Sequence, residues 1–379
     1  MSTQFTEQDR ETMQRVLDLA ARGSSTTQPN PRVGCVLVND GRIVGEGFHH
    51  MAGELHAERE ALKQAGEAAR GATAYVNLEP CCHQGRTPPC TDGLIDAGVT
   101  RVIGAMRDPN PLVAGGGYEQ LQMAGIEVAS GLLEGEARWL NRGFISRMQT
   151  GRPWVHLKMA ATLDGRTADV NGESKWISCD SARDQVQRMR AESSAVMTGI
   201  GTILADDASL NVRTEGAERQ PLRVVLDTDL RIPLDAKVIG ENEGLMVFTC
   251  SQDHEKISAL TERGVEVIEL NGALIDLQEV CRELAEWQCN EVLIEAGSTL
   301  AGALLETDLV DEMTLFYGGS VLGHTGRAMF ATAQAIEFAE RPHFDLREAE
   351  VVGESVVINS VKPNSLQRLM GKAPDSEAS

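Results

Sequence analysis

One histidine and two cysteines limit what this chain can fold into more than any other feature of its sequence. They occur in the runs His56-Ala57-Glu58, Pro80-Cys81 and Pro88-Pro89-Cys90. An imidazole and two thiolates can hold zinc and leave the fourth tetrahedral position open for water, which is the arrangement of catalytic zinc sites. We therefore expect a fold that brings these three distant segments to one metal centre.

Glu58 is the carboxylate that such a centre needs for proton transfer. Zinc lowers the pKa of bound water to about 7, so hydroxide is available at neutral pH. Attack on an amidine-like ring carbon also requires protons for the ring nitrogen and the leaving amine, a general acid–base contribution of about 10²–10⁴-fold. Because residues two apart do not share a face in mid-helix, we expect His56 and Glu58 at the start of a helix.

The spacing is similar to the zinc deaminase signature, H-x-E followed by P-C-x-x-C. It departs from that signature because the second cysteine, Cys90, comes much later than two residues after Cys81. A purely structural zinc site with His83 as the fourth ligand is the alternative. Cys82 could also replace Cys81, but Cys81 is preferred because it directly follows the proline.

Composition restricts the partners of the chain. Its formal net charge of −21 opposes binding to nucleic acid or to an anionic membrane and favours a small-molecule substrate. The polar start and the absence of an apolar run long enough for a bilayer favour a soluble, cytoplasmic protein. Eight cysteines in 379 residues without a secretory signal suggest metal ligands rather than disulfides.

Hydrophobic patterns predict a first α/β domain over residues 1–150. Thr6 and Asp9 form a capping box before a helix, and Asn39-Asp40-Gly41 indicates a hairpin. Strands are expected at 33–38, 43–46, 74–78, 101–106 and 126–129, with helices at 58–69 and between 88 and 98. Strands that alternate with helices indicate a layered α/β domain with a largely parallel sheet.

A second α/β domain is expected over residues 151–364. A connecting helix at 132–150 ends at Gly151-Arg152-Pro153, where we place the boundary. Strands are expected at 155–160, 195–199, 223–227, 245–249, 265–270, 291–296 and 312–317, and helices at 181–192, 275–288 and 299–307. The polar residues 365–379 are expected to form a disordered tail.

Longer motifs carry a specific resemblance. Residues 28–34 (Gln-Pro-Asn-Pro-Arg-Val-Gly), residues 78–90 around the two cysteines and Asp108-Pro109-Asn110-Pro111 resemble the bifunctional riboflavin-biosynthesis deaminase/reductase family. Cys82 departs from that family, which usually has serine there. The resemblance implies a cytidine-deaminase-like three-layer domain that deaminates a diaminopyrimidinone ribosylamino 5′-phosphate. By the same analogy, Asn30, His49 and His83 line the pyrimidine pocket and Arg86 binds the phosphate.

Two glycine-containing segments could hold a dinucleotide in the second domain. There is no G-x-G-x-x-G fingerprint after a strand. Residues 295–302 end a strand and open a helix, whose amides suit a pyrophosphate, and Gly199–Thr202 offers a second close approach. Either segment could instead be a tight turn between a strand and a helix.

Residues 155–160, 163–166, 172–177, 204–207 and 295–297 resemble the reductase domain of the same family. This resemblance implies a dihydrofolate-reductase-like fold and hydride transfer from NADPH to C1 of the ribosyl group, which becomes ribityl. The implied NADP contacts are Ala160, Trp176, Thr202, Asp206, Thr228, Gly297, Ser298, Thr299, Leu300, Ala301, Gly302 and Ala303. The implied substrate contacts are Ser174, Arg190, Leu210, Arg213 and Glu295.

Three charged residues of the second domain have roles that the sequence leaves open. Arg190 and Arg213 suit the substrate phosphate, although Arg190 could be a surface charge on its helix. Lys158 could polarise the sugar oxygen or donate a proton, or could only pair with a carboxylate.

Two other functions remain as alternatives. The chain could deaminate another nucleobase and carry a non-catalytic second domain, or it could be a zinc-stabilised binding module without turnover. The sequence does not determine the oligomeric state, and a homo-oligomer is compatible with it.

Overall fold

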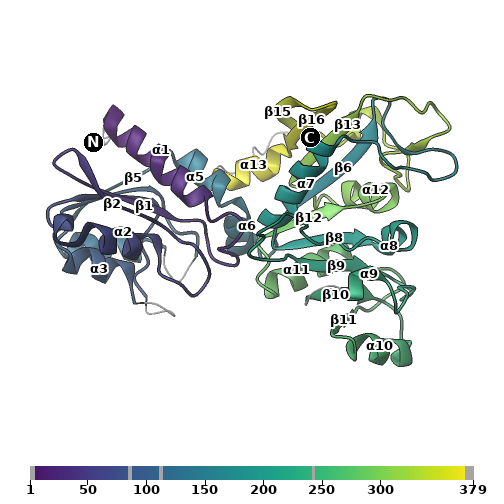
Figure 1. The fold of residues 1–379 in the computed structure, drawn as a ribbon, viewed down its shortest axis with the longest axis horizontal. Helices are drawn as coiled ribbons and strands as arrows, with labels where there is room; N and C mark the ends of the chain where they lie inside the picture. Colours follow the sequence, from purple (N-terminus) through teal and green to yellow (C-terminus); the bar gives the residue numbers. More distant parts are fainter. Residues whose placement is uncertain (1–4, 84–87, 111–113, 241–243, 372–379) are drawn as a thin grey trace. The chain divides into compact units, whose positions relative to one another are not determined.

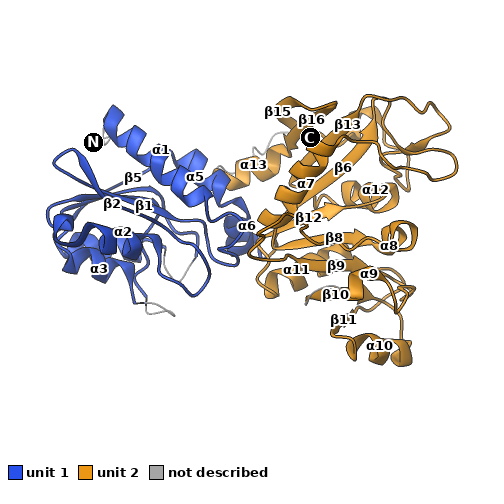
Figure 2. Cartoon of the chain, viewed as in Figure 1, with its two compact units in different colours: residues 1–151 blue, residues 152–379 orange. Residues whose placement is uncertain are grey.

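A computed structural model describes residues 5–83, 88–110, 114–240 and 244–371. The chain divides into two compact units, residues 1–151 and 152–379 (Figure 2). Within the described residues, no helix is both long enough and apolar enough to cross a membrane.

The first unit is built on a five-stranded sheet in the order β2-β1-β3-β4-β5 (Figure 1). The strands are β1 (Gly34–Asn39), β2 (Arg42–Phe48), β3 (Thr73–Leu78), β4 (Arg101–Met106) and β5 (Glu127–Ser130). The predicted hairpin is confirmed, because Asn39 pairs with Arg42 across Asp40-Gly41, both of which have positive φ. The sheet is mixed rather than largely parallel: β1 runs antiparallel to β2 and β3, and only β3–β4 and β4–β5 are parallel.

Helices cover both faces of this sheet. They are α1 (Glu7–Ala21), α2 (Ala57–Ala65), α3 (Cys90–Asp96) and α4 (Gly116–Met123), with a 3-10 turn, η1 (Gly66–Ala69), after α2. The Thr6–Asp9 capping box is confirmed at the start of α1. In Figure 1, α1 lies on one side of β1 and β2, and α2 and α3 lie on the other.

The connecting helix predicted at 132–150 is two helices, α5 (Glu134–Leu140) and α6 (Arg142–Thr150). Asn141 separates them. Its side chain accepts a hydrogen bond from the backbone N–H of Arg32 and donates one to the Arg32 carbonyl, at 2.8 and 3.0 Å. The side-chain amide of Asn141 therefore pairs with both backbone groups of Arg32, at the point where α5 ends and α6 begins.

The second unit is built on a nine-stranded sheet in the order β11-β10-β9-β8-β12-β6-β13-β16-β15. Its strands from β11 to β13 are parallel, and β16 and β15 complete one edge as antiparallel strands. The strands are β6 (Trp154–Thr162), β8 (Ala195–Gly199), β9 (Leu222–Leu226), β10 (Leu245–Thr249), β11 (Val265–Glu269), β12 (Glu291–Glu295), β13 (Glu312–Gly318), β15 (Asp345–Val352) and β16 (Ser355–Val361). The short strands β7 (Arg166–Ala168) and β14 (Arg327–Ala328) pair separately.

All seven strands predicted for this unit are present, and β7, β14, β15 and β16 were not predicted. The helices are α7 (Asp180–Glu192), α8 (Ile200–Asp206), α9 (Lys237–Gly240), α10 (His254–Thr261), α11 (Leu277–Glu286), α12 (Ser298–Glu306) and α13 (Pro363–Leu369), with a 3-10 turn, η2 (Phe338–Glu340). Of these, α7, α11 and α12 were predicted.

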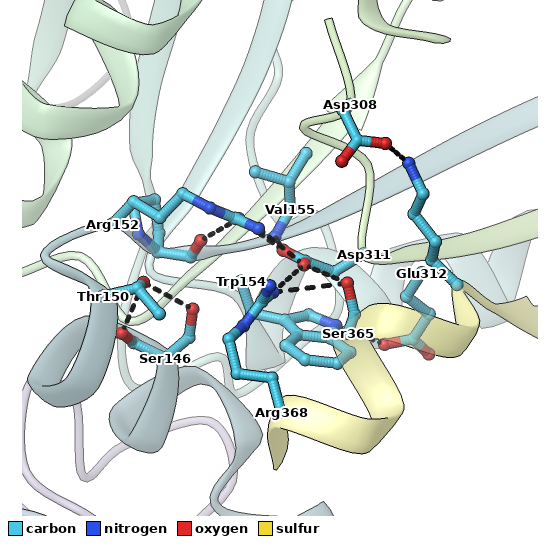
Figure 3. A network of polar contacts seen from close by, with 12 residues as sticks. Ser146, Thr150, Arg152, Trp154, Val155, Asp308, Asp311, Glu312, Ser365 and Arg368 are labelled. Atoms are coloured by element: carbon cyan, nitrogen blue, oxygen red, sulfur yellow. Dashed lines mark hydrogen bonds and ion pairs between the residues drawn. The ribbon is translucent and has the colours of Figure 1, made fainter. Parts of the chain in front are cut away.

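The C-terminal segment differs from the expected disordered tail, because residues 363–369 form α13. The Ser365 hydroxyl and the Arg368 guanidinium donate to the fully buried carboxylate of Asp311, at 2.6 and 2.8 Å, and Leu369 is buried (Figure 3). Arg152 donates two further hydrogen bonds to the same carboxylate. The polar side chains of Ser365 and Arg368 thus bind the buried carboxylate of Asp311, a contact that the sequence alone does not indicate.

Candidate active sites

The first unit brings the three predicted metal ligands together. His56 is the N-cap of α2, Cys81 lies just beyond β3, and Cys90 is the first residue of α3. Nδ1 of His56 lies 3.6 Å from Sγ of Cys81 and 3.3 Å from Sγ of Cys90, and the possible ligand atoms of the three all lie within 4.8 Å of one another. One imidazole nitrogen and two sulfurs are a suitable donor set for zinc.

The electrostatics of this cluster favour thiolate formation at one cysteine. Hydrogen bonding from the Cys90 thiol lowers the pKa of Cys81 to about 4; burial opposes this effect and His56 adds to it. The same contact with Cys81 raises the pKa of Cys90. The hydrogen bond between His56 and Cys81 raises the pKa of His56, although burial of the imidazole acts in the opposite direction. The sulfur of Cys81 accepts a further hydrogen bond from the Cys90 backbone N–H at 3.4 Å.

Glu58 lies in the first turn of α2, two residues after the metal-ligand candidate His56, as the spacing predicted. Its side chain is buried, with the residue 3% exposed. Burial raises the pKa of its carboxyl group, and the nearby Cys81 contributes in the same direction. The start of α2 therefore places a carboxylate and an imidazole beside the two cysteines.

Two of the predicted pyrimidine-pocket residues lie next to this cluster. Nδ2 of Asn30 and Nε2 of His49 are 3.0 Å apart, and Nδ1 of His49 is 3.0 Å from the carbonyl oxygen of Leu55. The rings of His49 and His56 pack edge to face with centroids 5.3 Å apart. Asn30 and His49 thus form a polar wall connected to the metal-ligand candidate His56.

The structure does not test the other two predicted substrate contacts, His83 and Arg86. His83 is exposed and does not belong to the ligand cluster found among the described residues. Arg86 lies outside the described residues. Cys82 is also outside that cluster, and its sulfur lies next to Gly116 at the start of α4.

Two residues with no role predicted from the sequence support the segments that carry the cluster. Arg59, beside Glu58, donates to the carbonyl of Pro89, directly before Cys90. Glu79 precedes Pro80-Cys81 and accepts hydrogen bonds from the backbone N–H groups of Asp108, Gly115, Gly117 and Tyr118. The indication available in the sequence was position: Arg59 directly follows Glu58, and Glu79 lies two residues before Cys81.

In the second unit, the predicted cofactor residues gather at one edge of the sheet. Strands β9, β8, β12 and β6 are adjacent and parallel. Ala160 lies near the carboxyl end of β6, Thr202 and Asp206 follow β8, Thr228 follows β9, and residues 297–303 follow β12. The chain changes direction across the sheet at β12, which lies between β8 and β6, and ligands of open α/β sheets bind at such switch points.

The start of α12 fits a dinucleotide phosphate. Gly297 is its N-cap, no side chain caps this end, and an added Cβ at Gly297 would have no described neighbour within 4 Å. Gly201, in α8, is similarly open. Helix N-terminal amides facing open space are a suitable cradle for an anion. Trp176 is 71% exposed rather than part of the core, and the Arg183 guanidinium stacks on its ring at 4.4 Å.

A buried charged cluster lies at the same edge of the sheet. Arg190, in the last turn of α7, forms an ion pair with Glu295 at the end of β12 and donates to the carbonyl of Asn211 at 2.8 Å. Burial opposes ionisation of Glu295, but Arg190, with help from Lys158, holds its pKa below the usual value. Burial lowers the pKa of Lys158, which Glu295 partly offsets.

This cluster shows what Arg190 contacts within the protein. Its guanidinium is paired with Glu295 and donates to the Asn211 carbonyl, and the residue is only 8% exposed, so it is not a surface charge on its helix. Its contact with the substrate stays a prediction. Arg213 is exposed and remains the better phosphate candidate. Of the other substrate candidates, Ser174 is half-buried and Leu210 is buried.

Comparison with known proteins gives two family matches. Residues 6–106 match the cytidine and deoxycytidylate deaminase zinc-binding region, and residues 153–358 match the RibD C-terminal domain. Riboflavin biosynthesis protein RibD of Escherichia coli (strain K12) is 46% identical over 366 residues, covering 93% of this chain and 99% of that protein. RibD of Haemophilus influenzae is 47% identical over 365 residues, covering 93% and 97%.

Solved structures agree with these matches. Acinetobacter baumannii RibD has a TM-score of 0.88 at 45% identity, covering 94% of this chain and 99% of that one. A diaminohydroxyphosphoribosylaminopyrimidine deaminase/5-amino-6-(5-phosphoribosylamino)uracil reductase from Thermotoga maritima has a TM-score of 0.84 at 37% identity, with the same coverage.

Proposed function

This chain belongs to the RibD family of riboflavin biosynthesis proteins and is a bifunctional deaminase and reductase, and we propose which of its residues perform each activity. The first unit, with residues 1–150, deaminates a diaminopyrimidinone ribosylamino 5′-phosphate. The second, with residues 151–364, reduces the ribosyl group of the product to ribityl with NADPH. The substrate is a phosphorylated small molecule.

In the deaminase, His56, Cys81 and Cys90 hold zinc. The chemistry that zinc supplies when bound is the activation of a water molecule at neutral pH. Glu58 moves protons to the ring nitrogen and the leaving amine, because the first turn of α2 places its carboxylate beside the ligand cluster. This convergence of three ligands and a buried carboxylate is the observation that carries the proposal.

Asn30 and His49 orient the pyrimidine ring. Their mutual contact of 3.0 Å fixes the Asn30 amide, and the Leu55 carbonyl accepts from Nδ1 of His49. Burial lowers the pKa of His49, which favours a neutral imidazole. His83 and Arg86 remain proposed substrate contacts from the family resemblance, with Arg86 for the phosphate.

In the reductase, NADPH binds along the carboxyl ends of β9, β8, β12 and β6. The backbone amides that lack a partner at the start of α12, directly after Gly297, would hold its diphosphate. The other proposed contacts with the cofactor are the α12 residues up to Ala303, together with Ala160, Trp176, Thr202, Asp206 and Thr228. The proposed substrate contacts are Ser174, Arg190, Leu210, Arg213 and Glu295. Lys158, whose charge interacts with those of Glu295 and Arg190, would act on the reacting sugar as a proton donor or as a partner of its oxygen.

Incubation with the diaminopyrimidinone phosphate tests the two activities separately. Without NADPH the protein should release ammonia and form the deaminated product, and adding NADPH should then cause oxidation of the cofactor in proportion to that product. Ammonia release without NADPH oxidation would favour a deaminase with a non-catalytic second domain. Absence of both would leave only a zinc-stabilised binding module.

A further inference from the structure

Glu79 lies between β3 and the metal-ligand candidate Cys81, and it has no place in the chemistry described above. Its side chain is buried, with the residue 3% exposed. We propose that Glu79 is a positioning residue that fixes the Cys81 segment to the start of α4 and thereby sets the geometry of the metal site. This inference rests on the proposed zinc role of Cys81.

The carboxylate of Glu79 is fully used by backbone donors. Oε1 accepts from the N–H groups of Gly117 and Tyr118 at 2.9 and 3.2 Å, and Oε2 accepts from those of Asp108 and Gly115 at 3.2 and 3.0 Å. Three of these donors belong to the N-cap and first turn of α4, where amides have no partner within the helix. The fourth, Asp108, lies two residues beyond the end of β4. One side chain therefore joins the ends of β3 and β4 to α4.

The packing of α4 gives an independent indication of the same junction. An added Cβ at Gly117 would lie 2.0 Å from the carbonyl oxygen of Pro80, so the helix backbone directly contacts the residue between Glu79 and Cys81. An added Cβ at Gly116 would lie 3.1 Å from Sγ of Cys82. The segment 79–82 therefore contacts the first turn of α4 in two ways. The Glu79 carboxylate accepts hydrogen bonds from the helix amides, and the Pro80 backbone packs against Gly117.

The chemistry of the four donors makes the carboxylate specific. A glutamine of the same shape presents one acceptor oxygen and one NH₂ group, so either amide orientation places N–H against two backbone N–H groups. A buried donor without an acceptor is costly, and the loop and helix would move to find another partner. Because Cys81 is only two residues away, that movement displaces the sulfur from His56 and Cys90.

Glu79→Gln in the full chain tests this inference through the affinity for zinc, measured by competition with a chromogenic chelator. We expect zinc to bind about 10- to 100-fold more weakly than in the unaltered protein, the range for residues that orient metal ligands. Deamination should lose kcat, whereas NADPH-dependent reduction of pre-deaminated substrate should be unchanged. Glu79→Asp, which keeps the charge but is one methylene shorter, should give an intermediate zinc affinity and applies if Glu79→Gln fails to fold.

Asp9→Asn is the matched control. Asp9 is also a buried carboxylate of the first unit, capping α1 and accepting from the Tyr75 hydroxyl on β3 at 2.6 Å, but it does not contact residues 79–81. It should lower the melting temperature without changing the zinc affinity. Unaltered zinc affinity and kcat in both Glu79 variants, with only a lower melting temperature, would show that Glu79 merely supports the fold. No zinc binding by the unaltered protein would instead refute the proposed metal site itself.

Discussion

Nη2 of Arg190 donates a hydrogen bond of 3.0 Å to Oε2 of Glu295, and Nε of the same guanidinium donates to Oε1. Their side chains are only 9% and 15% exposed. Such a bidentate ion pair depends on the planar guanidinium, and lysine cannot form it. It connects the last turn of α7 to the carboxyl end of β12, beside the proposed cofactor cradle.

Arg190→Met should destabilise the second unit by about 3–5 kcal/mol, because it leaves the buried Glu295 without its main partner. Denaturant unfolding measures this loss. Arg190→Met combined with Glu295→Leu removes both charges and should recover part of the stability, yet reduction should remain impaired because the site is altered. Equal stability of the single variant and the unaltered protein would contradict a buried ion pair here.

Lys158→Met should reduce the rate of NADPH oxidation by about 10²-fold or more, the contribution expected of a positioned proton donor. NADPH binding, followed by fluorescence, and ammonia release should be unchanged. His156→Gln is the matched control: His156 lies two residues earlier on the same strand face and is bonded to Thr314 at 2.7 Å, so reduction should persist. Normal reduction by Lys158→Met would exclude Lys158 from the chemistry.

Glu58→Gln should lower the rate of ammonia release by about 10²–10⁴-fold, because the amide cannot carry protons to the substrate. Zinc content, measured by elemental analysis, should stay near that of the unaltered protein since Glu58 is not among the three ligand candidates. Glu60→Gln, two residues later in α2, serves as the control and should deaminate normally. Unchanged deamination by Glu58→Gln would remove this residue from its proposed role.

Cys90→Ser should abolish zinc binding and deamination together, because one of three protein ligands is lost. Reduction of pre-deaminated substrate should continue, since Cys90 belongs to the first compact unit and the reductase residues to the second. Removing zinc from the unaltered protein with a chelator should reproduce this pattern. Loss of both activities in folded Cys90→Ser protein would show that the two units depend on each other.

Local patterns were sufficient wherever a single segment determines the structure. Apolar runs located every strand of the parallel series in the second unit, and Asn39-Asp40-Gly41 identified the hairpin. The ligand triad followed from residue types, with His-x-Glu followed by Pro-Cys and a later cysteine, so His56, Cys81 and Cys90 could be selected although the second cysteine departs from the usual spacing. Strand β15 was missed because almost all its residues are exposed at the sheet edge and leave no apolar alternation.

Pairings between distant segments could not be predicted. Arg190 and Glu295 are 105 residues apart, and nothing near either residue indicates the other. The substrate role of Arg190 was therefore predicted from the family resemblance and from the general suitability of arginine for phosphate, without its ion pair being foreseen. The contacts of Glu79 could not be predicted either, because its donors are backbone N–H groups, which every residue except proline has. They belong to Asp108, Gly115, Gly117 and Tyr118.

A chain ending at Lys362 should be less stable than the full chain, because it loses α13 and with it the Ser365 and Arg368 bonds to Asp311 (Figure 3). Val155 N–H and Arg152 still donate to that fully buried carboxylate, so we expect a loss of about 1–3 kcal/mol, the cost of unmet hydrogen bonds, rather than unfolding. A chain ending at Gly371 retains α13 and is the control, with the melting temperature of the full chain. If both truncations melt alike, the helix contributes nothing to the stability of the second unit.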